Sequence, residues 1–210
     1  ATVAAGGNAT ICSSGTYTLA GTMGGSATSI TWTTSGSGTF SSATSTTAVY
    51  TPSAADIAAG SVTLTITTDN PAGPCNAVTD VMTLTISPAA TVNAGPNDVI
   101  CSNGSANLVG TFGGSATGVT WTTSGSGTFG SSTSASTTYT PSAADISSGT
   151  VTLTITTNDP AGPCTSATDF ITLTISPAAT AAAGANQTIC AGSTVTLTGS
   201  IGGSATTSTW

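Results

Sequence analysis

A repeat of 89 residues runs through the chain and constrains its fold more than any other feature. No gap is needed to align residues 1–89 with 90–178, and about two thirds of the aligned positions are identical. The recurring pairs include Cys12 and Cys101, Trp32 and Trp121, Pro52 and Pro141, Cys75 and Cys164, and Pro88 and Pro177. A fixed period of this length indicates tandem domains. We therefore predict two complete domains at 1–89 and 90–178, with residues 179–210 as the incomplete start of a third.

The third copy contains only 32 residues and stops at Trp210, inside a predicted strand. A segment this short cannot bury a hydrophobic core of its own. We therefore expect the natural chain to continue. The alternative is that a neighbouring molecule completes these strands, as in donor-strand assembly.

Apolar residues alternate with threonine inside each repeat. In residues 61–68, Val62, Leu64 and Ile66 alternate with threonines, which is the pattern of a half-buried strand. Similar patterns predict further strands near 2–11 (broken at Gly6-Gly7), 16–22, 28–34, 46–51 and 79–86. Several short strands between Gly, Ser and Pro clusters are typical of an immunoglobulin-like sandwich. The predicted fold class is all-β: tandem Ig-like antiparallel β-sandwiches joined head to tail, with Ig-like repeats at 1–89 and 90–178 and the start of a third at 179–210.

A few larger residues are predicted to stabilise each sandwich. Trp32 and its copy Trp121 are expected to be the large core residues of the third strand. Ser53 followed by Asp56 resembles a capping box, which predicts one helical turn that ends at Gly60. Asp145 is the equivalent cap in the second repeat.

Tyrosines and prolines recur at the edges of these elements. Tyr50 and Tyr139 precede the helical turns, and we expect their hydroxyls to fix this corner as a tyrosine corner does. Pro88 and Pro177 lie in the short Ser-Pro-Ala-Ala links. Because such links are too short and too restricted to be floppy tethers, we predict a semi-rigid rod. The expected partners are neighbouring repeats and identical chains in a filament.

The charge composition excludes several classes of function. The chain has seven Asp, no Lys, Arg or His, and a formal net charge of −7. A nucleophile needs a base beside it, and neither His nor Lys is present, so we predict no enzyme and no catalytic residue. Without cations the chain should not bind nucleic acid. The sequence has no run of 18 apolar residues, so we predict no membrane insertion. We also expect no cofactor.

Metal binding has only weak candidates in this sequence. Asp69 and Asp80 flank one loop, and Asp159 and Asp169 flank its counterpart. Calcium takes six to eight oxygen ligands, so two carboxylates are few. We interpret these residues as solvated turn residues and predict no metal site.

Two binding functions remain as alternatives to a structural role. The loops 24–27 and 35–38 could hold a glycan or a surface, but they have almost no aromatic or charged group to grip one, and we interpret them as flexible turns. Thr63, Thr65 and Thr67 would form a hydroxyl array together with Thr83 and Thr85, as on some ice-binding proteins. Thr also suits any exposed strand, and sheets twist out of register with a lattice.

The five cysteines lack zinc-type spacing, which favours disulfides in an oxidising compartment. One pairing lies within repeats, Cys12 with Cys75 and Cys101 with Cys164. The other joins repeats, Cys12 with Cys164. In a sandwich Cys12 should lie at the bottom and Cys75 at the top, about 23 Å apart along a seven-residue strand, whereas bridged Cα atoms lie within about 7 Å. We favour the pairing between repeats and leave the other open.

Several strings together suggest a family. They are AGANQTICAGSTVTLTGSIGGSATTSTW, TTSGSGTF, YTPSAADI and AGPC. The chain resembles the PKD-like and immunoglobulin-like repeats of very large Bacteroidetes surface and secreted proteins. That resemblance covers the whole period and implies display at the bacterial cell surface or outside the cell, as a spacer or adhesin without catalysis. It implies no particular ligand and no shared binding residue.

Overall fold

The computed structural model describes residues 1–69, 76–158, 160 and 162–209. The described chain divides into two compact units. The first comprises Ala1–Thr91, Gly113–Thr117 and Thr157–Ala167, and the second comprises Val92–Phe112, Gly118–Thr156 and Thr168–Trp210. Each unit is described by itself.

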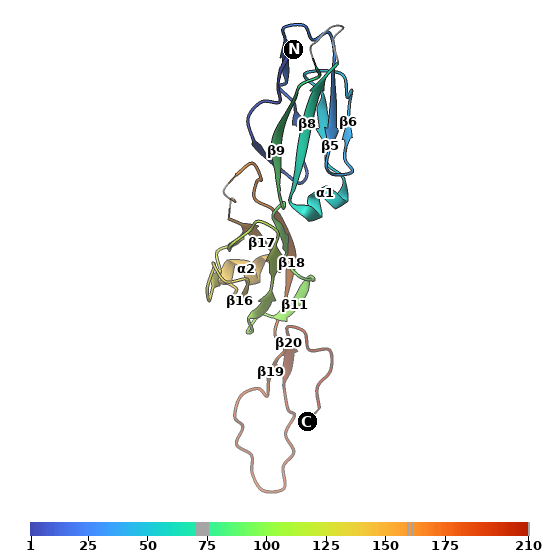
Figure 1. Ribbon diagram of the computed structural model, residues 1–210. Coiled ribbons are helices and arrows are strands. Elements are labelled where there is room, and N and C mark those ends of the chain that lie inside the picture. Colours follow the sequence, from blue (N-terminus) through green and yellow to red (C-terminus); the bar gives the residue numbers. More distant parts are fainter. Residues whose placement is uncertain (70–75, 159, 161, 210) are drawn as a thin grey trace. The chain divides into compact units, whose positions relative to one another are not determined.

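The first unit contains two facing sheets. The larger sheet has the order β2-β9-β8-β5, and the smaller has the order β3-β7-β6. Its strands are β1 (Thr2–Ala4), β2 (Ala9–Cys12), β3 (Tyr17–Thr18), β4 (Thr22–Gly24), β5 (Ile30–Thr34), β6 (Thr39–Phe40), β7 (Val49–Thr51), β8 (Ser61–Thr68) and β9 (Thr79–Ser87). β8 and β9 lie side by side along the unit, and helix α1 (Ala54–Ala59) lies at the end where β9 finishes (Figure 1).

The second unit repeats this topology. Its larger sheet has the order β11-β18-β17-β14, and its smaller sheet has the order β12-β16-β15. Its elements are β10 (Thr91–Asn93), β11 (Asp98–Cys101), β12 (Ala106–Val109), β13 (Thr111–Gly113), β14 (Val119–Thr123), β15 (Thr128–Phe129), β16 (Ser136–Thr140), α2 (Ala143–Ser148), β17 (Thr150–Thr157) and β18 (Thr168–Ser176). The all-β sandwich fold predicted from the sequence is confirmed.

One strand pair in each larger sheet is parallel, which the prediction of antiparallel sandwiches missed. β2 runs parallel to β9, and β11 runs parallel to β18. The reason lies in the break after β1. Gly6 has φ of 93°, a conformation that glycine adopts readily, and there the chain leaves its pairing with β4 for the edge of the larger sheet. This crossing places the end of β2 beside the end of β9.

The core lies between the two sheets of each sandwich. In the first unit Leu64 and Ile66 of β8 are fully buried, whereas Thr63 and Thr65 of the same strand are not. Tyr50 of the smaller sheet packs into the same cluster. The alternation of apolar residues and threonine therefore separates a buried face from an exposed one.

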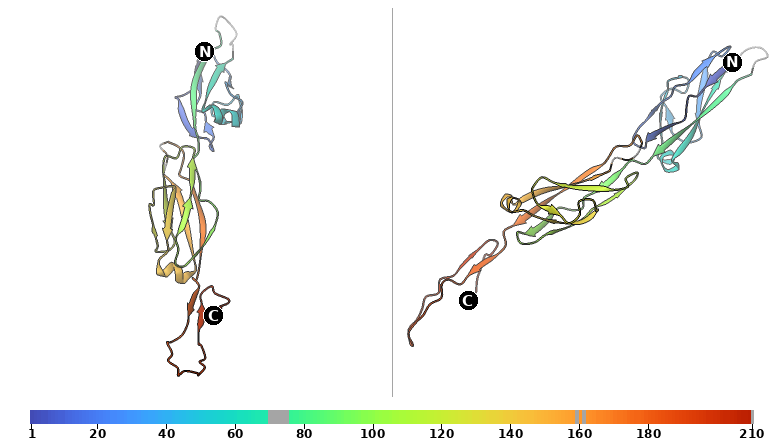
Figure 2. Two further views of the ribbon diagram at one scale, coloured as in Figure 1. Left: turned by 90° about the horizontal axis from the view of Figure 1, so that it is seen from below. Right: turned by 90° about the vertical axis from the view of Figure 1, so that its left-hand side faces the viewer.

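Residues after 178 form little regular structure. β19 (Thr180–Ala182) pairs with β20 (Ser200–Gly202), and residues 183–199 between them form a loop without strands or helices (Figure 2). The side chains of Ile189 and Leu197 are 50% and 58% exposed. Their counterparts in the second repeat, Ile100 and Leu108, are partly or fully buried.

Among the described residues, no helix combines the length and the apolar character that crossing a membrane requires.

Candidate functional site

A disulfide joins Cys12 to Cys164 inside the first compact unit, with Cα atoms 4.9 Å apart. Cys12 is the last residue of β2, and the parallel register puts it opposite Ser87, the last residue of β9. Cys164 belongs to the segment Thr157–Ala167, which comes from the second sequence repeat. A single bond therefore connects the end of the first sandwich to a loop 152 residues further along the chain.

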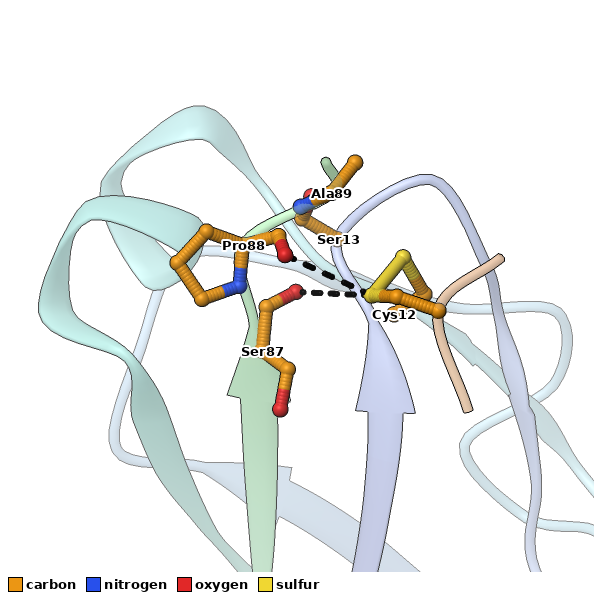
Figure 3. Close-up of a disulfide and its surroundings, with 6 residues drawn as sticks. Cys12, Ser13, Ser87, Pro88 and Ala89 are labelled. Atoms are coloured by element: carbon orange, nitrogen blue, oxygen red, sulfur yellow. Dashed lines mark hydrogen bonds between the residues drawn. A yellow bond between two sulfur atoms is a disulfide. The ribbon is translucent and has the colours of Figure 1, made fainter. Parts of the chain in front are cut away.

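Residues 87–89, which follow or end β9, are contacted both by Ser13 and by the sulfur of Cys164. Ser13 donates its backbone N–H to the Ser87 carbonyl at 2.8 Å, and its hydroxyl accepts the N–H of Ala89 at 2.9 Å. The sulfur of Cys164 lies 3.5 Å from the carbonyl oxygen of Ser87 and 3.4 Å from that of Pro88 (Figure 3). A disulfide sulfur carries no proton, so these two are polar contacts in the oxidised protein. The disulfide and Ser13 therefore both contact residues 87–89.

The pairing of Cys101 with Cys164 is wrong for this structure. Cys101 is exposed and unbonded, as is Cys190. Cys101 lies opposite Ser176 at the end of β18, whereas Cys164 precedes the start of that nine-residue strand. Cys164 is bonded to Cys12 and so has no thiol left to pair with Cys101. Cys75 lies outside the described residues, and its proposed partner Cys12 is already bonded to Cys164.

A buried carboxylate organises the corner between β7 and α1. The side chain of Asp56 is 2% exposed. It accepts the hydroxyl of Tyr50 at 2.7 Å and the backbone N–H groups of Ser37 at 2.9 Å and Ser53 at 3.0 Å. Ser53 in turn caps α1 by accepting the N–H of Asp56, and Gly60 ends the helix with φ of 75°. Asp56 is therefore a cap and also the centre of a wider network.

The hydrogen bonds at Asp56 decide its ionisation. Burial alone would raise the pKa, but the donors from Ser37, Ser53 and Tyr50 outweigh it and lower the pKa to about 2. Burial raises the pKa of the Tyr50 hydroxyl, which stays protonated and donates to Asp56. At this corner the Tyr50 hydroxyl donates to a carboxylate. The tyrosine corner that the sequence suggested would instead bond to a backbone group.

The second repeat has the same network. Tyr139 donates to Asp145 at 2.8 Å, and the N–H groups of Ser126, Gly127 and Ser142 complete the shell at 2.9–3.0 Å. The pKa of Asp145 is likewise lowered to about 2, because these donors outweigh its burial. Two copies of one arrangement indicate that the YTPSAADI and TTSGSGTF strings form a single structural motif.

The loop 35–38 is part of this motif, which the interpretation as a flexible turn missed. A Cβ atom on Gly36 would lie 2.1 Å from Asp56 Oδ1, and one on Gly38 would lie 2.5 Å from the Tyr50 hydroxyl. Only glycine lets the backbone approach the carboxylate this closely. The signal in the sequence was the glycine spacing upstream of the capping box, repeated 89 residues later.

The two tryptophans occupy equivalent core positions. Trp32 and Trp121 are each 2% exposed. Their indole N–H groups donate to the carbonyls of Ser45 at 3.1 Å and Ala135 at 3.2 Å. Both therefore bury a large apolar surface and satisfy their one polar group.

The aspartates considered for calcium already bind backbone groups. Asp69 accepts the N–H groups of Thr28 and Ser29, Asp80 accepts that of Ala5, and Asp169 accepts that of Ala94. The described part of the chain has no group of three or more His, Cys, Asp or Glu side chains suited to a metal. Asp159 lies outside that part. Asp69, Asp80 and Asp169 therefore act as acceptors for backbone N–H groups that lie 40 to 75 residues away in the chain.

The threonine face of the larger sheet is interrupted. Thr63 lies opposite Thr83, but Thr65 lies opposite Val81, which is 56% exposed. In the second unit the equivalent position is Phe170, 62% exposed, opposite Thr154. An apolar residue in the middle of each face breaks the hydroxyl array that the sequence suggested.

Comparison with known proteins identifies the fold. No protein-family model matches the chain, and no curated protein is similar to it in sequence. The insect immune protein hemolin matches with a TM-score of 0.50 and 11% identity, over 83% of this chain and 46% of hemolin. Extracellular domains 3–5 of Drosophila OTK match with a TM-score of 0.47 and 8% identity, over 80% of this chain and 59% of theirs. Identities this low show the tandem immunoglobulin-like fold alone.

Proposed function

We propose that the chain is a repeat region of an extracellular structural protein, a surface rod, fibre or giant adhesin of bacterial origin, with domains at 1–89 and 90–178. The observation that carries the proposal is the disulfide between Cys12 and Cys164. It ties the end of one sequence repeat to a loop of the next, in addition to the peptide link through Pro88. A second covalent connection suits a chain that carries tension.

Chemistry and composition support the same proposal. A disulfide persists in an oxidising compartment such as the outside of the cell. The side chains include no Lys, Arg or His, so the repeats lack the usual bases and nucleophile partners of enzymes. The carboxylates at Asp56 and Asp145 are enclosed by structural hydrogen bonds.

Single-molecule stretching tests the proposal. A closed Cys12–Cys164 bond removes a separation of 152 residues from the extensible chain. At 3.3–3.6 Å per residue, reduction should release about 500 Å of additional contour length. The alternative pairing, Cys12 with Cys75 and Cys101 with Cys164, would hide about 210 Å in each repeat on the same scale and release it in two separate steps. The variant Cys12→Ser/Cys164→Ser is the control, since its full length should be available without reductant.

The stretching result has two outcomes that contradict the proposal. Equal contour lengths before and after reduction would mean that no bond bears load between Cys12 and Cys164. Two separate releases of about 210 Å each, in place of one of about 500 Å, would mean that the repeats are closed individually and are not bonded to each other.

A further inference from the structure

The end of β11 copies the end of β2 in detail. Cys101 lies opposite Ser176 in the parallel register, as Cys12 lies opposite Ser87. Ser102 donates its N–H to the Ser176 carbonyl at 2.8 Å and accepts the N–H of Ala178 at 3.0 Å. Ser13 makes the equivalent bonds at 2.8 and 2.9 Å. The backbone that surrounds the bonded cysteine in the first unit is therefore already formed around the unbonded one.

The two cysteine sites differ in what covers them. In the first unit, Pro163, Thr165 and Ser166 of the Cys164 loop line one shallow hollow together with Ile11, Cys12 and Gly15. Ile11 is buried, and Cys12 and Gly15 are partly buried.

The equivalent residues of the second unit are each more exposed. Ile100 is partly buried, and Cys101 and Gly104 are exposed. Ile, Cys and Gly are the same residue types at all three pairs of positions, so their chemistry does not explain the difference. Among the described residues, the surface that the Cys164 loop covers in the first unit is more exposed in the second.

We propose that the Ile100, Cys101 and Gly104 surface is a docking site for the AGPC-containing loop of a further copy of this repeat, fixed by a disulfide to Cys101. The partner is a repeat of the same sequence because the occupied site shows which loop fits. Its cysteine would lie against the Ser176 and Pro177 carbonyls, as Cys164 lies against those of Ser87 and Pro88. This inference rests on the proposed function and names the partner of the next joint.

The bond is an ordinary thiol oxidation. Two thiols, one on Cys101 and one on the partner loop, lose two protons and two electrons to an oxidant of the disulfide-exchange class, and one S–S bond forms. The thiolate of one cysteine attacks a mixed disulfide on the other, and the oxidant leaves as its reduced thiol.

An extended chain tests the inference. Residues 179–210 correspond to 90–121, so a copy of residues 122–178 appended after Trp210 completes the third repeat in register. After oxidative folding, mass spectrometry of non-reduced peptides should link Cys101 to the appended copy of Cys164. Maleimide labelling of Cys101 in the folded protein should fall at least tenfold relative to the 210-residue chain. Cys101→Ser in the extended chain should leave the appended cysteine open to labelling.

The same digest separates this inference from the proposed function. The Cys12–Cys164 peptide is an internal reference. If that peptide is present and Cys101 stays reactive, or if the appended cysteine pairs with Cys190, the inference is overturned and the proposed function stands. If Cys12 and Cys164 are themselves unlinked, the proposed function fails. The third repeat completed in this way could fail to fold. A second extended chain, in which residues 90–121 also replace 179–210, then has an intact copy of residues 90–178 as its third repeat.

Discussion

Replacing Asp56 by asparagine should remove the largest single contribution to the acid sensitivity of the first sandwich. The carboxylate is 2% exposed and accepts three hydrogen bonds from Tyr50, Ser37 and Ser53. Its pKa is lowered from 3.8 to about 2 in the folded protein. A group with a lowered folded-state pKa stabilises the fold above its unfolded pKa, and that contribution is lost as the pH falls through the folded pKa.

The size of this effect follows from the shift. A difference of just under two pKa units, at 1.36 kcal/mol each, corresponds to about 2 kcal/mol of unfolding free energy. This contribution should be complete at pH 7 and decline between about pH 4 and pH 2. At pH 7 the variant Asp56→Asn should lose about 3 kcal/mol, because its amide presents a donor where the carboxylate accepts from buried donors. The variant should then keep only the weaker acid dependence that comes from Asp69 and Asp80, whose pKa values are also lowered by hydrogen bonds but which are less buried.

Urea unfolding at pH 7 and at pH 2.5 measures the free energies. Hydrogen exchange at pH 7 in peptides from β8 and β17 shows which sandwich is affected, so the second repeat is an internal control. The matched variant Asp145→Asn should shift the effect to β17. The reasoning would be refuted if Asp56→Asn kept the acid dependence of the wild type, or if it cost under 1 kcal/mol at pH 7.

Three further outcomes are expected. Gly36→Ala should destabilise the first sandwich by about 2 kcal/mol or more in urea unfolding, since the new Cβ would lie 2.1 Å from Asp56 Oδ1. Gly7→Ala is the control and should change stability little, because a Cβ there would have no atom within 4 Å. Chelation with EDTA should leave the thermal midpoint unchanged, because Asp69, Asp80 and Asp169 already accept backbone N–H groups; a fall of several degrees would contradict this. Raising salt from 10 to 200 mM should raise stability by a few tenths of a kcal/mol, since it screens repulsion in a chain of net charge −7, and a decrease would count against it.

The sandwich can be predicted from two periodicities in the sequence. The 89-residue offset and the alternation of apolar residues with threonine indicate the strands, and the Ser53 to Asp56 spacing indicates α1 with its capping box. Each of these signals is local, so one residue type at one spacing is enough to predict the element.

What the sequence could not predict depends on contacts between distant residues. The parallel pairing of β2 with β9 joins segments 75 residues apart, and no local pattern distinguishes it from an antiparallel one. The close approach of Gly36 and Gly38 to Asp56 requires the corner to be folded first. A single sequence does not distinguish a loop glycine that packs on a carboxylate from one that lies far from any carboxylate.

A chain without basic side chains must satisfy its carboxylates in another way. Asp56, Asp69, Asp80, Asp145 and Asp169 all accept backbone N–H groups. A backbone donor is fixed by the fold and needs no flexible side chain to be ordered, so these bonds avoid the entropic cost of a surface ion pair. They also exist only while the loops that supply the donors stay in place. Each of these five aspartates therefore holds a loop in place against the sandwich. The disulfide does the same between repeats, because it fixes a loop of one repeat to the end of another.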